Sequence, residues 1–294
     1  MDLTGMAVSV IAYQEPKHLY VTLDALTMVH GIDQFPITVY VDGGLSDETR
    51  AEQESALACF PAVCSEFSEV NIGIRENVMR GLRRPIENGA TSILFIEDDH
   101  LVRPDILSIP LNDETGCFFI ALNQCFWQIK KKYRISRYNA KGNVITAENA
   151  RKLLEWLDAK AYIGRIYRNN ANPIGETYMG HDVLPNIYLR DHGEFSVFPV
   201  GMYVSHFGLF GVNFARQSAS TELLELEQRM FAGDKTQWLD NIAKILEAGD
   251  YPTEPSVIEE RLYPRGFKYY GDVDNTPSTE HWIAGIPGGP ETVI

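Results

Sequence analysis

The chain is poor in positive charge and has no long apolar run. Its 294 residues include 26 Lys and Arg against 40 Asp and Glu, so the formal net charge is −14. A protein with such an excess of acidic residues is repelled by the phosphate backbone, which argues against non-specific binding to nucleic acid. No apolar run is long enough to cross a bilayer, and residues 1–6 carry no basic flank. We therefore expect a cytoplasmic protein without a membrane span that binds small or metal-bound anions.

Cysteine is also scarce, and its four copies form no metal-binding pattern. Cys59, Cys64, Cys117 and Cys125 include no Cys-x-x-Cys pair and lie in apolar surroundings. This argues against structural zinc and against a disulfide framework, and it favours reduced thiols. Repeats and low-complexity tracts are absent as well. The length suffices for one large α/β domain or for a domain with an appended lobe.

What the sequence does contain is an alternation of apolar runs and amphipathic stretches. Residues 6–13 and 37–42 are strand-like, and each is followed by a stretch with helical spacing. Ser46 is expected to cap the second helix, because a serine at this position can accept a backbone hydrogen bond of the first turn. Two acids follow it in that turn, where the helix dipole favours negative charge. Two such units in succession predict a right-handed, doubly wound sheet.

Later segments follow a less regular pattern. Residues 117–123 are strand-like, and Thr146 is expected to cap a helix. Residues 130–138 are strongly basic and have no core face, so we expect a loop or an edge hairpin there. Residues 223–231 and 238–246 have the spacing of amphipathic helices. From residue 251 onward prolines, glycines and aromatics predominate, which predicts an extended tail.

The most informative stretch is an apolar strand that ends in three acids. Residues 93–96 are all apolar, and Glu97, Asp98 and Asp99 follow directly. Such a run is typical of a strand buried on both faces of a parallel sheet, and ligands bind at the carboxyl edge of these sheets where the strand order reverses. Clustered carboxylates repel one another unless a cation holds them, and hard oxygen ligands suit Mg²⁺ or Mn²⁺ carrying a diphosphate. The alternative is a solvated turn after a core strand.

The order of these motifs resembles that of the nucleotide-sugar glycosyltransferases with the GT-A fold, both family 2 enzymes and type I N-acetylglucosaminyltransferases. Residues 41–47 resemble the V-D-D-G-S-x-D turn of that family, and residues 71–81 resemble its N-x-G helix. Residues 96–99 resemble its metal-binding D-x-D element in the E-D-D form. Residues 180–182 resemble the segment that supplies the catalytic base, and residues 204–206 resemble the histidine segment that closes over the diphosphate.

This resemblance extends over about residues 5–215 and implies a GT-A, Rossmann-like fold, in which a doubly wound mixed sheet precedes an irregular C-terminal extension. We accordingly predict a catalytic domain at residues 1–215 and a helical and extended region at residues 216–294 that packs on it. The implied activity is metal-dependent transfer of a hexosyl or pentosyl group from a nucleotide-diphosphate sugar to an acceptor hydroxyl, with inversion. A UDP-sugar is the favoured donor, and Mn²⁺ or Mg²⁺ is the implied cofactor.

The implied contacts with the nucleotide sugar fall on six residues: Tyr13, Glu15, Asp42, Arg75, Asp98 and Asn143. Tyr13 and Glu15 would line the base and ribose pocket. Asp42 would accept hydrogen bonds from the base or ribose, unless it only shapes the following turn as an Asx-turn. Arg75 would contact phosphate or sugar from a helix N-terminus, where a cation is otherwise disfavoured. Asp98 would face the ribose and the sugar, and Asn143 would line the acceptor side.

The implied metal ligands are Asp99 and His206, with Glu97 in a supporting role. A cation held there would stabilise the departing nucleoside diphosphate. Without the resemblance, His206 is equally well explained as a histidine satisfied by its surroundings. Asp182 is the implied general base toward the acceptor hydroxyl. The alternatives are that Asp182 caps a helix or that Glu176 is the base.

The chain departs from the family at two positions. Residue 43 is glycine where many members carry a second aspartate, and His181 stands where another acid is usual. The acceptor stays open among a glycan, a small molecule and a modified nucleic-acid base, the last suggested by residues 130–137. A nucleotidyltransferase is a competing class, but residues 14–17 replace the glycine-rich basic loop that such enzymes carry. A non-catalytic sugar-nucleotide binding protein is a further alternative.

Overall fold

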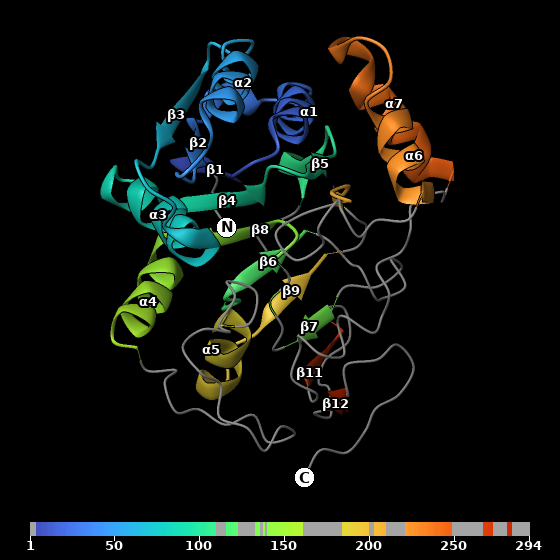
Figure 1. Ribbon diagram of the computed structural model, residues 1–294. Helices are drawn as coiled ribbons and strands as arrows, with labels where there is room; N and C mark the ends of the chain where they lie inside the picture. Colours follow the sequence, from blue (N-terminus) through green and yellow to red (C-terminus); the bar gives the residue numbers. More distant parts are fainter. Residues whose placement is uncertain are drawn as a thin grey trace.

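The computed structural model describes residues 4–109, 116–122, 133–135, 138, 140–160, 184–199, 203–209, 221–248, 267–272 and 281–283. Within this part of the chain, a ten-stranded mixed sheet is the central element (Figure 1). Its strands, in spatial order, are β12 (His281–Ile283), β11 (Phe267–Asp272), β7 (Tyr133–Ile135), β9 (Ser196–Phe198), β6 (Phe119–Ala121), β8 (Asn143–Thr146), β4 (Ser92–Glu97), β1 (Met6–Ala12), β2 (Ile37–Val41) and β3 (Val63–Phe67).

The first half of the chain builds the parallel side of this sheet. Helix α1 (Pro16–Thr27) leads from β1 to β2, and α2 (Asp47–Leu57) leads from β2 to β3 at the edge. Helix α3 (Gly73–Glu87) then returns the chain to β4, which pairs with the other side of β1. The strand order therefore reverses between β1 and β4.

Helices cover both faces of the central strands (Figure 1). Apolar side chains of these strands point to each face. Leu94 and Ile96 of β4 belong to the core under α1 and α2. Ile93 and Phe95 belong to the core under α3 and α4 (Ala147–Asp158). The predicted fold class, a doubly wound mixed α/β sheet, is confirmed.

Two predicted helix caps are confirmed. The Ser46 hydroxyl accepts a hydrogen bond from the amide of Thr49 at 3.1 Å, at the start of α2. The Thr146 hydroxyl accepts one from the amide of Asn149 at 3.2 Å, at the start of α4. Each bond satisfies a backbone donor that the first turn of a helix leaves open.

The second half of the sheet is antiparallel in part. β8 lies between β4 and β6 and runs antiparallel to both. β7 pairs with β9 on one side and β11 on the other, so the prediction of a loop or edge hairpin is wrong for its three residues. Helix α5 (Leu184–His192) packs beside α4, with the rings of Trp156 and Tyr188 at 5.5 Å. The short 3₁₀ helices η1 (Ile32–Gln34) and η2 (Ile106–Ser108) complete this part of the fold.

The C-terminal region contributes two helices and two strands. Helices α6 (Thr221–Met230) and α7 (Lys235–Ala248) were predicted. They pack on each other, and α7 packs on α1, where the rings of Tyr20 and Trp238 lie 5.8 Å apart. Strands β11 and β12 continue the sheet, although the sequence predicted only an extended tail here. None of the helices in the described residues is long and apolar enough to cross a membrane.

Candidate functional site

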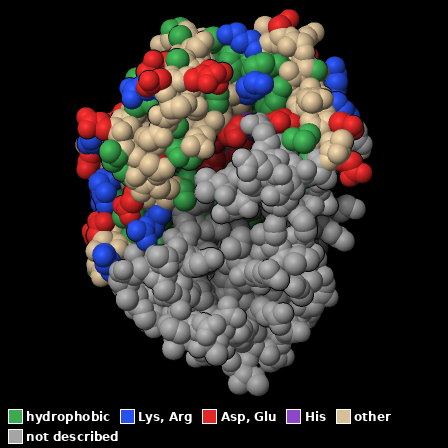
Figure 2. Space-filling view, viewed as in Figure 1, with side chains coloured by type: hydrophobic (Ala, Val, Ile, Leu, Met, Phe, Trp, Pro, Cys, Tyr) green, Lys and Arg blue, Asp and Glu red, His purple; other side chains and the backbone are tan. Residues whose placement is uncertain are grey.

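Acidic side chains gather where the strand order reverses. β1 ends just before Tyr13, and β4 ends just before Asp98. The amide of Tyr13 donates to Oδ2 of Asp98 at 3.0 Å, and the amide of Asp98 donates to the carbonyl of Ile11 at 2.9 Å. Figure 2 shows acidic side chains within a recess of the described surface. Two predicted contact residues are thus neighbours at the carboxyl edge of the sheet, where ligands bind in such folds.

A separate two-stranded ladder brings the two predicted metal ligands together. β5 (His100–Val102) pairs antiparallel with β10 (Val204–His206), which places His206 opposite His100. Nε2 of His206 lies 2.8 Å from Oδ2 of Asp99. The amide of Phe207 also donates to the Asp99 carbonyl at 2.9 Å. Residues that are far apart in the sequence therefore meet directly beside Asp98.

Gly208 is the glycine that permits this close approach. A Cβ atom at this position would overlap Oδ2 of Asp99 and would lie 3.0 Å from its carboxyl carbon. We expect Gly208→Ala to push the Asp99 carboxylate away from His206 and to weaken divalent-cation binding by about tenfold or more. Calorimetric titration with Mn²⁺ measures this. A Mn²⁺ affinity of Gly208→Ala equal to that of the wild-type protein would contradict the prediction.

The pKa values of the adjacent Asp98 and Asp99 are shifted in opposite directions. Burial, together with the neighbouring charge of Asp99, raises the pKa of Asp98 well above its usual value. Burial also acts to raise the pKa of Asp99, but the charge and hydrogen bond of His206, with His100 and His18 nearby, lower it overall. Asp99 is therefore the ionised member of the pair, as a cation ligand has to be.

His100 belongs to this cluster, although the sequence analysis assigned it no role. Its side chain is fully buried, and Nδ1 accepts a hydrogen bond from the amide of Glu97 at 3.0 Å. Nε2 lies 3.7 Å from Oδ1 of Asp99. Burial lowers the pKa of His100 to about 4, so the ring is neutral at physiological pH.

The donor atoms of this cluster fit a divalent cation. Glu97, Asp99 and His100 each offer a ligand atom within 4.8 Å of the others, and His206 adds a second imidazole. Oδ1 of Asp99 is buried and has no hydrogen-bond partner among the described residues, so it is open either to a cation or to a further hydrogen-bond donor. Carboxylates suit Mg²⁺ and Mn²⁺, and imidazole suits transition metals, so this mixed donor set fits a divalent cation without selecting one.

Glu15 and His18 lie close to the two aspartates, since the charge of Glu15 acts on the pKa of Asp98 and that of His18 on the pKa of Asp99. Oε2 of Glu15 lies 3.4 Å from Nδ1 of His18, which is itself buried. The His18 ring stacks on Phe207 at 5.4 Å and meets the edge of Phe231 at 5.0 Å. His18 thus joins the loop after β1, the segment after β10 and the α6–α7 turn. Sequence reasoning missed it because a histidine on the inner face of a helix has no pattern of its own.

Asp42 lies at the end of β2 with its carboxylate turned toward α3. Oδ1 accepts hydrogen bonds from the amides of Gly43 and Ile72, both at 2.8 Å, and Oδ2 accepts one from Gly73 at 2.9 Å. These bonds fasten the turn after β2 to the start of α3. A Cβ at position 43 would lie 2.5 Å from the backbone carbon of Val70, so the second aspartate of the resembled family has no room here.

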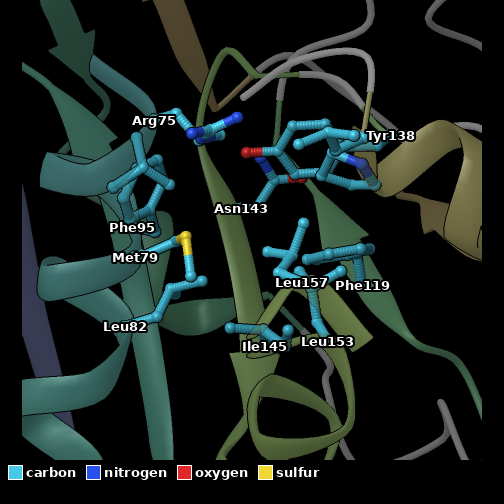
Figure 3. A pocket seen from close by; sticks show the side chains of 13 residues that line it. Arg75, Met79, Leu82, Phe95, Phe119, Tyr138, Asn143, Ile145, Leu153 and Leu157 are labelled. Atoms are coloured by element: carbon cyan, nitrogen blue, oxygen red, sulfur yellow. The ribbon is translucent and has the colours of Figure 1, made fainter. Parts of the chain in front are cut away.

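Arg75 and Asn143 line one cavity between α3 and β8 (Figure 3), where Asn143 pairs with Phe95, two residues before Glu97. With Tyr138 they form the polar end of a cavity whose remaining walls are apolar. Its free volume is about 20 Å³, roughly the room that one water molecule needs. In this conformation the cavity is too small for a sugar, so the contacts predicted for Arg75 and Asn143 stay predictions.

Several predicted residues lie outside the described part of the chain. They include the predicted base Asp182, its alternative Glu176, and the lysines of the basic stretch at residues 130–132. The described residues therefore contain the predicted metal ligands and nucleotide contacts but not the predicted base.

Comparisons with known proteins give neither a family model nor a curated protein that matches this chain. Among solved structures, it is similar to the mannosyltransferase PcManGT from Pyrobaculum calidifontis in complex with GDP-Man and Mn²⁺, with 13% identity, 87% of this chain and 79% of that chain covered, and a TM-score of 0.47. It is similar to S. aureus TarS in complex with UDP-GlcNAc, with 16% identity, 81% and 72% covered, and a TM-score of 0.45. It is also similar to a cytidylyltransferase from Leptospira borgpetersenii, with 13% identity, 84% and 95% covered, and a TM-score of 0.47. Likeness at this level assigns the chain to no family.

Proposed function

We propose that this protein is a metal-dependent glycosyltransferase of the GT-A type whose donor is a nucleotide-diphosphate sugar. The observation that carries the proposal is the 2.8 Å contact between Oδ2 of Asp99 and Nε2 of His206 at the reversal of strand order. Asp99 and His206 would hold Mn²⁺ or Mg²⁺, with His206 giving up the Nε2 proton that now faces Oδ2. The bound cation would supply Lewis-acid stabilisation of the departing nucleoside diphosphate.

The other residues of the recess would orient the donor. Tyr13 and Glu15, after β1, border the acids that follow β4, so a nucleotide bound between them would place its diphosphate beside Asp98 and Asp99. A UDP-sugar is the donor we favour. Arg75, in the first turn of α3, would meet phosphate or sugar oxygens.

The acceptor half of the reaction rests on Asp182 as the proposed general base. Its carboxylate would remove the proton from an acceptor hydroxyl as the sugar is displaced with inversion. A glycan, a small molecule and a modified nucleic-acid base are the acceptor classes to test. Asn143, buried at the start of β8, would lie on the acceptor side.

A thermal-shift panel tests the donor half. We expect UDP or another nucleoside diphosphate to raise the melting temperature by about 5 °C at a hundredfold excess over its Kd, and only when Mn²⁺ is present. EDTA should abolish the shift. Equal shifts with and without Mn²⁺, or no shift with any nucleoside diphosphate, would overturn the proposal. A stronger shift with a nucleoside triphosphate than with any diphosphate would instead favour a nucleotidyltransferase.

A further inference from the structure

His100 contacts the cluster of acids in a way that fixes which of its nitrogens carries the proton. Nδ1 accepts the amide hydrogen of Glu97 at 3.0 Å. A neutral imidazole has one donor and one acceptor nitrogen, so the proton is on Nε2. The ring is fully buried at the start of β5. Any rotation of the ring would break the hydrogen bond between Nδ1 and the amide of Glu97.

The Nε2–H group faces the open oxygen of Asp99. Nε2 lies 3.7 Å from Oδ1, and both atoms are buried without a hydrogen-bond partner among the described residues. A donor and an acceptor that are shielded from water and left just beyond bonding distance are costly to maintain. A small rotation of the carboxylate would bring them into contact.

The opposite oxygen of Asp99 is held by the other histidine of the ladder. Nε2 of His206 lies 2.8 Å from Oδ2, and the two imidazole rings meet edge to face across β5 and β10, with centroids 6.0 Å apart and planes at 72°. The two histidines differ in one respect that matters for ligation. The Nδ1 of His100 is committed to a backbone amide, so its Nε2 has to remain a donor.

We propose that His100 is a positioning residue, which donates its Nε2–H to Oδ1 of Asp99 and so presents Oδ2 to the cation beside His206. This inference rests on the proposed function, because it assigns a task within the same metal site. Hydrogen bonds from an outer residue to a ligating carboxylate fix its orientation, and their loss typically weakens metal binding by about 10- to 100-fold.

The competing role is direct ligation by His100, since its ring belongs to the group of ligand atoms that lie within 4.8 Å. Ligation through Nε2 would move the proton to Nδ1. The Nδ1–H would then oppose the amide hydrogen of Glu97, and two donors would face each other in a buried place. The two roles therefore predict opposite protonation of Nε2 in the loaded protein.

Two substitutions test the contributions of Nδ1 and Nε2 of His100 one at a time. In His100→Asn the side-chain oxygen takes the place of Nδ1 and keeps the bond to Glu97, but nothing reaches Asp99. In His100→Gln the amide nitrogen takes the place of Nε2 and can donate to Asp99, but the bond to Glu97 is lost. We expect His100→Asn to weaken Mn²⁺ binding by about 10- to 100-fold and His100→Gln by less than about tenfold. Electron paramagnetic resonance of free Mn²⁺, recorded with the nucleoside diphosphate that gives the largest thermal shift, measures both.

His30→Asn is the matched control, since His30 is exposed and lies on a different segment. Mn²⁺ affinity in His100→Asn equal to that of wild type would overturn the inference while leaving the proposed function standing. Failure of the wild-type protein to bind Mn²⁺ with any nucleoside diphosphate would overturn the proposed function, and the inference with it.

Nitrogen-15 spectra of the wild-type histidines decide between the roles even if a variant does not fold. With saturating Mg²⁺ and nucleoside diphosphate, we expect Nε2 of His100 to stay protonated and Nδ1 to stay unprotonated. Loss of the proton from Nε2 on adding Mg²⁺ would make His100 a ligand and would overturn the positioning role.

Discussion

Replacing Asp99 with asparagine is expected to abolish cation-dependent nucleotide binding and to lower turnover by about 10²- to 10³-fold. The amide has the same shape as the carboxylate but no charge. It also presents an NH₂ group either to Nε2 of His206, which now lies 2.8 Å from Oδ2, or to the cation. Release of the nucleoside diphosphate from the donor sugar, measured with saturating Mn²⁺, gives the turnover.

Asp105→Asn is the matched control for this substitution. Asp105 follows the same acidic stretch, but its carboxylate is half-exposed and pairs with Arg103 at 2.6 Å. This variant should retain the activity and the Mn²⁺ dependence of the wild-type protein. Turnover of Asp99→Asn within a factor of two of wild type would show that the cation, if used at all, is held elsewhere.

The second large effect is expected on stability rather than on chemistry. Asp42→Ala removes the acceptor of three backbone amides that join the end of β2 to the start of α3. Leaving these donors unsatisfied should cost about 3 kcal/mol, which corresponds to a fall of about 5 °C or more in melting temperature. Asp42→Asn should lose about half as much, because its amide oxygen still accepts two of the three bonds.

Asp33→Ala serves as the control, since Asp33 is exposed. The stability series also decides the role of Asp42 in nucleotide binding. If Asp42→Asn melts like the wild-type protein but no longer binds nucleotide, the carboxylate contacts the base or ribose directly. The structural role assigned here would then be wrong.

The parallel half of the sheet could be predicted from the sequence because its signals are local and strong. The strands at residues 6–12 and 92–97 are made mostly of apolar residues, and both helix caps use hydroxyl side chains at their usual position. The edge strand β3 was missed, since its residues are half-exposed and show no apolar run. Propensity and periodicity report burial, so a strand with little burial gives little signal.

The antiparallel insertion was harder to foresee. β8 has two apolar residues between Asn143 and Thr146, and the sequence around it was interpreted as the approach to a capped helix. Its place between β4 and β6 depends on long-range pairing that no local pattern encodes. β11 and β12 were missed for the same reason.

The candidate site was predicted where resemblance and strand ends agreed. Asp99 and His206 were expected together, and the structure places them 2.8 Å apart. His100 was overlooked because the sequence does not show which atoms its two ring nitrogens contact, and its role follows from those contacts. That Arg75 and Asn143 line one small cavity together with apolar side chains also required coordinates.

The pairing of β5 with β10 restricts the number of residues between the start of β10 and His206. The Leu122 carbonyl accepts the amides of both Tyr203 and Val204, at 2.9 and 3.2 Å, so the start of β10 is fixed. Successive side chains of a strand point to opposite sides, and inserting or deleting a single residue before His206 would turn its imidazole away from Asp99. We therefore expect related proteins with the same pair of aspartate and histidine to differ in the residue at position 205. The number of residues between Tyr203, which is hydrogen-bonded to Leu122, and His206 should stay the same.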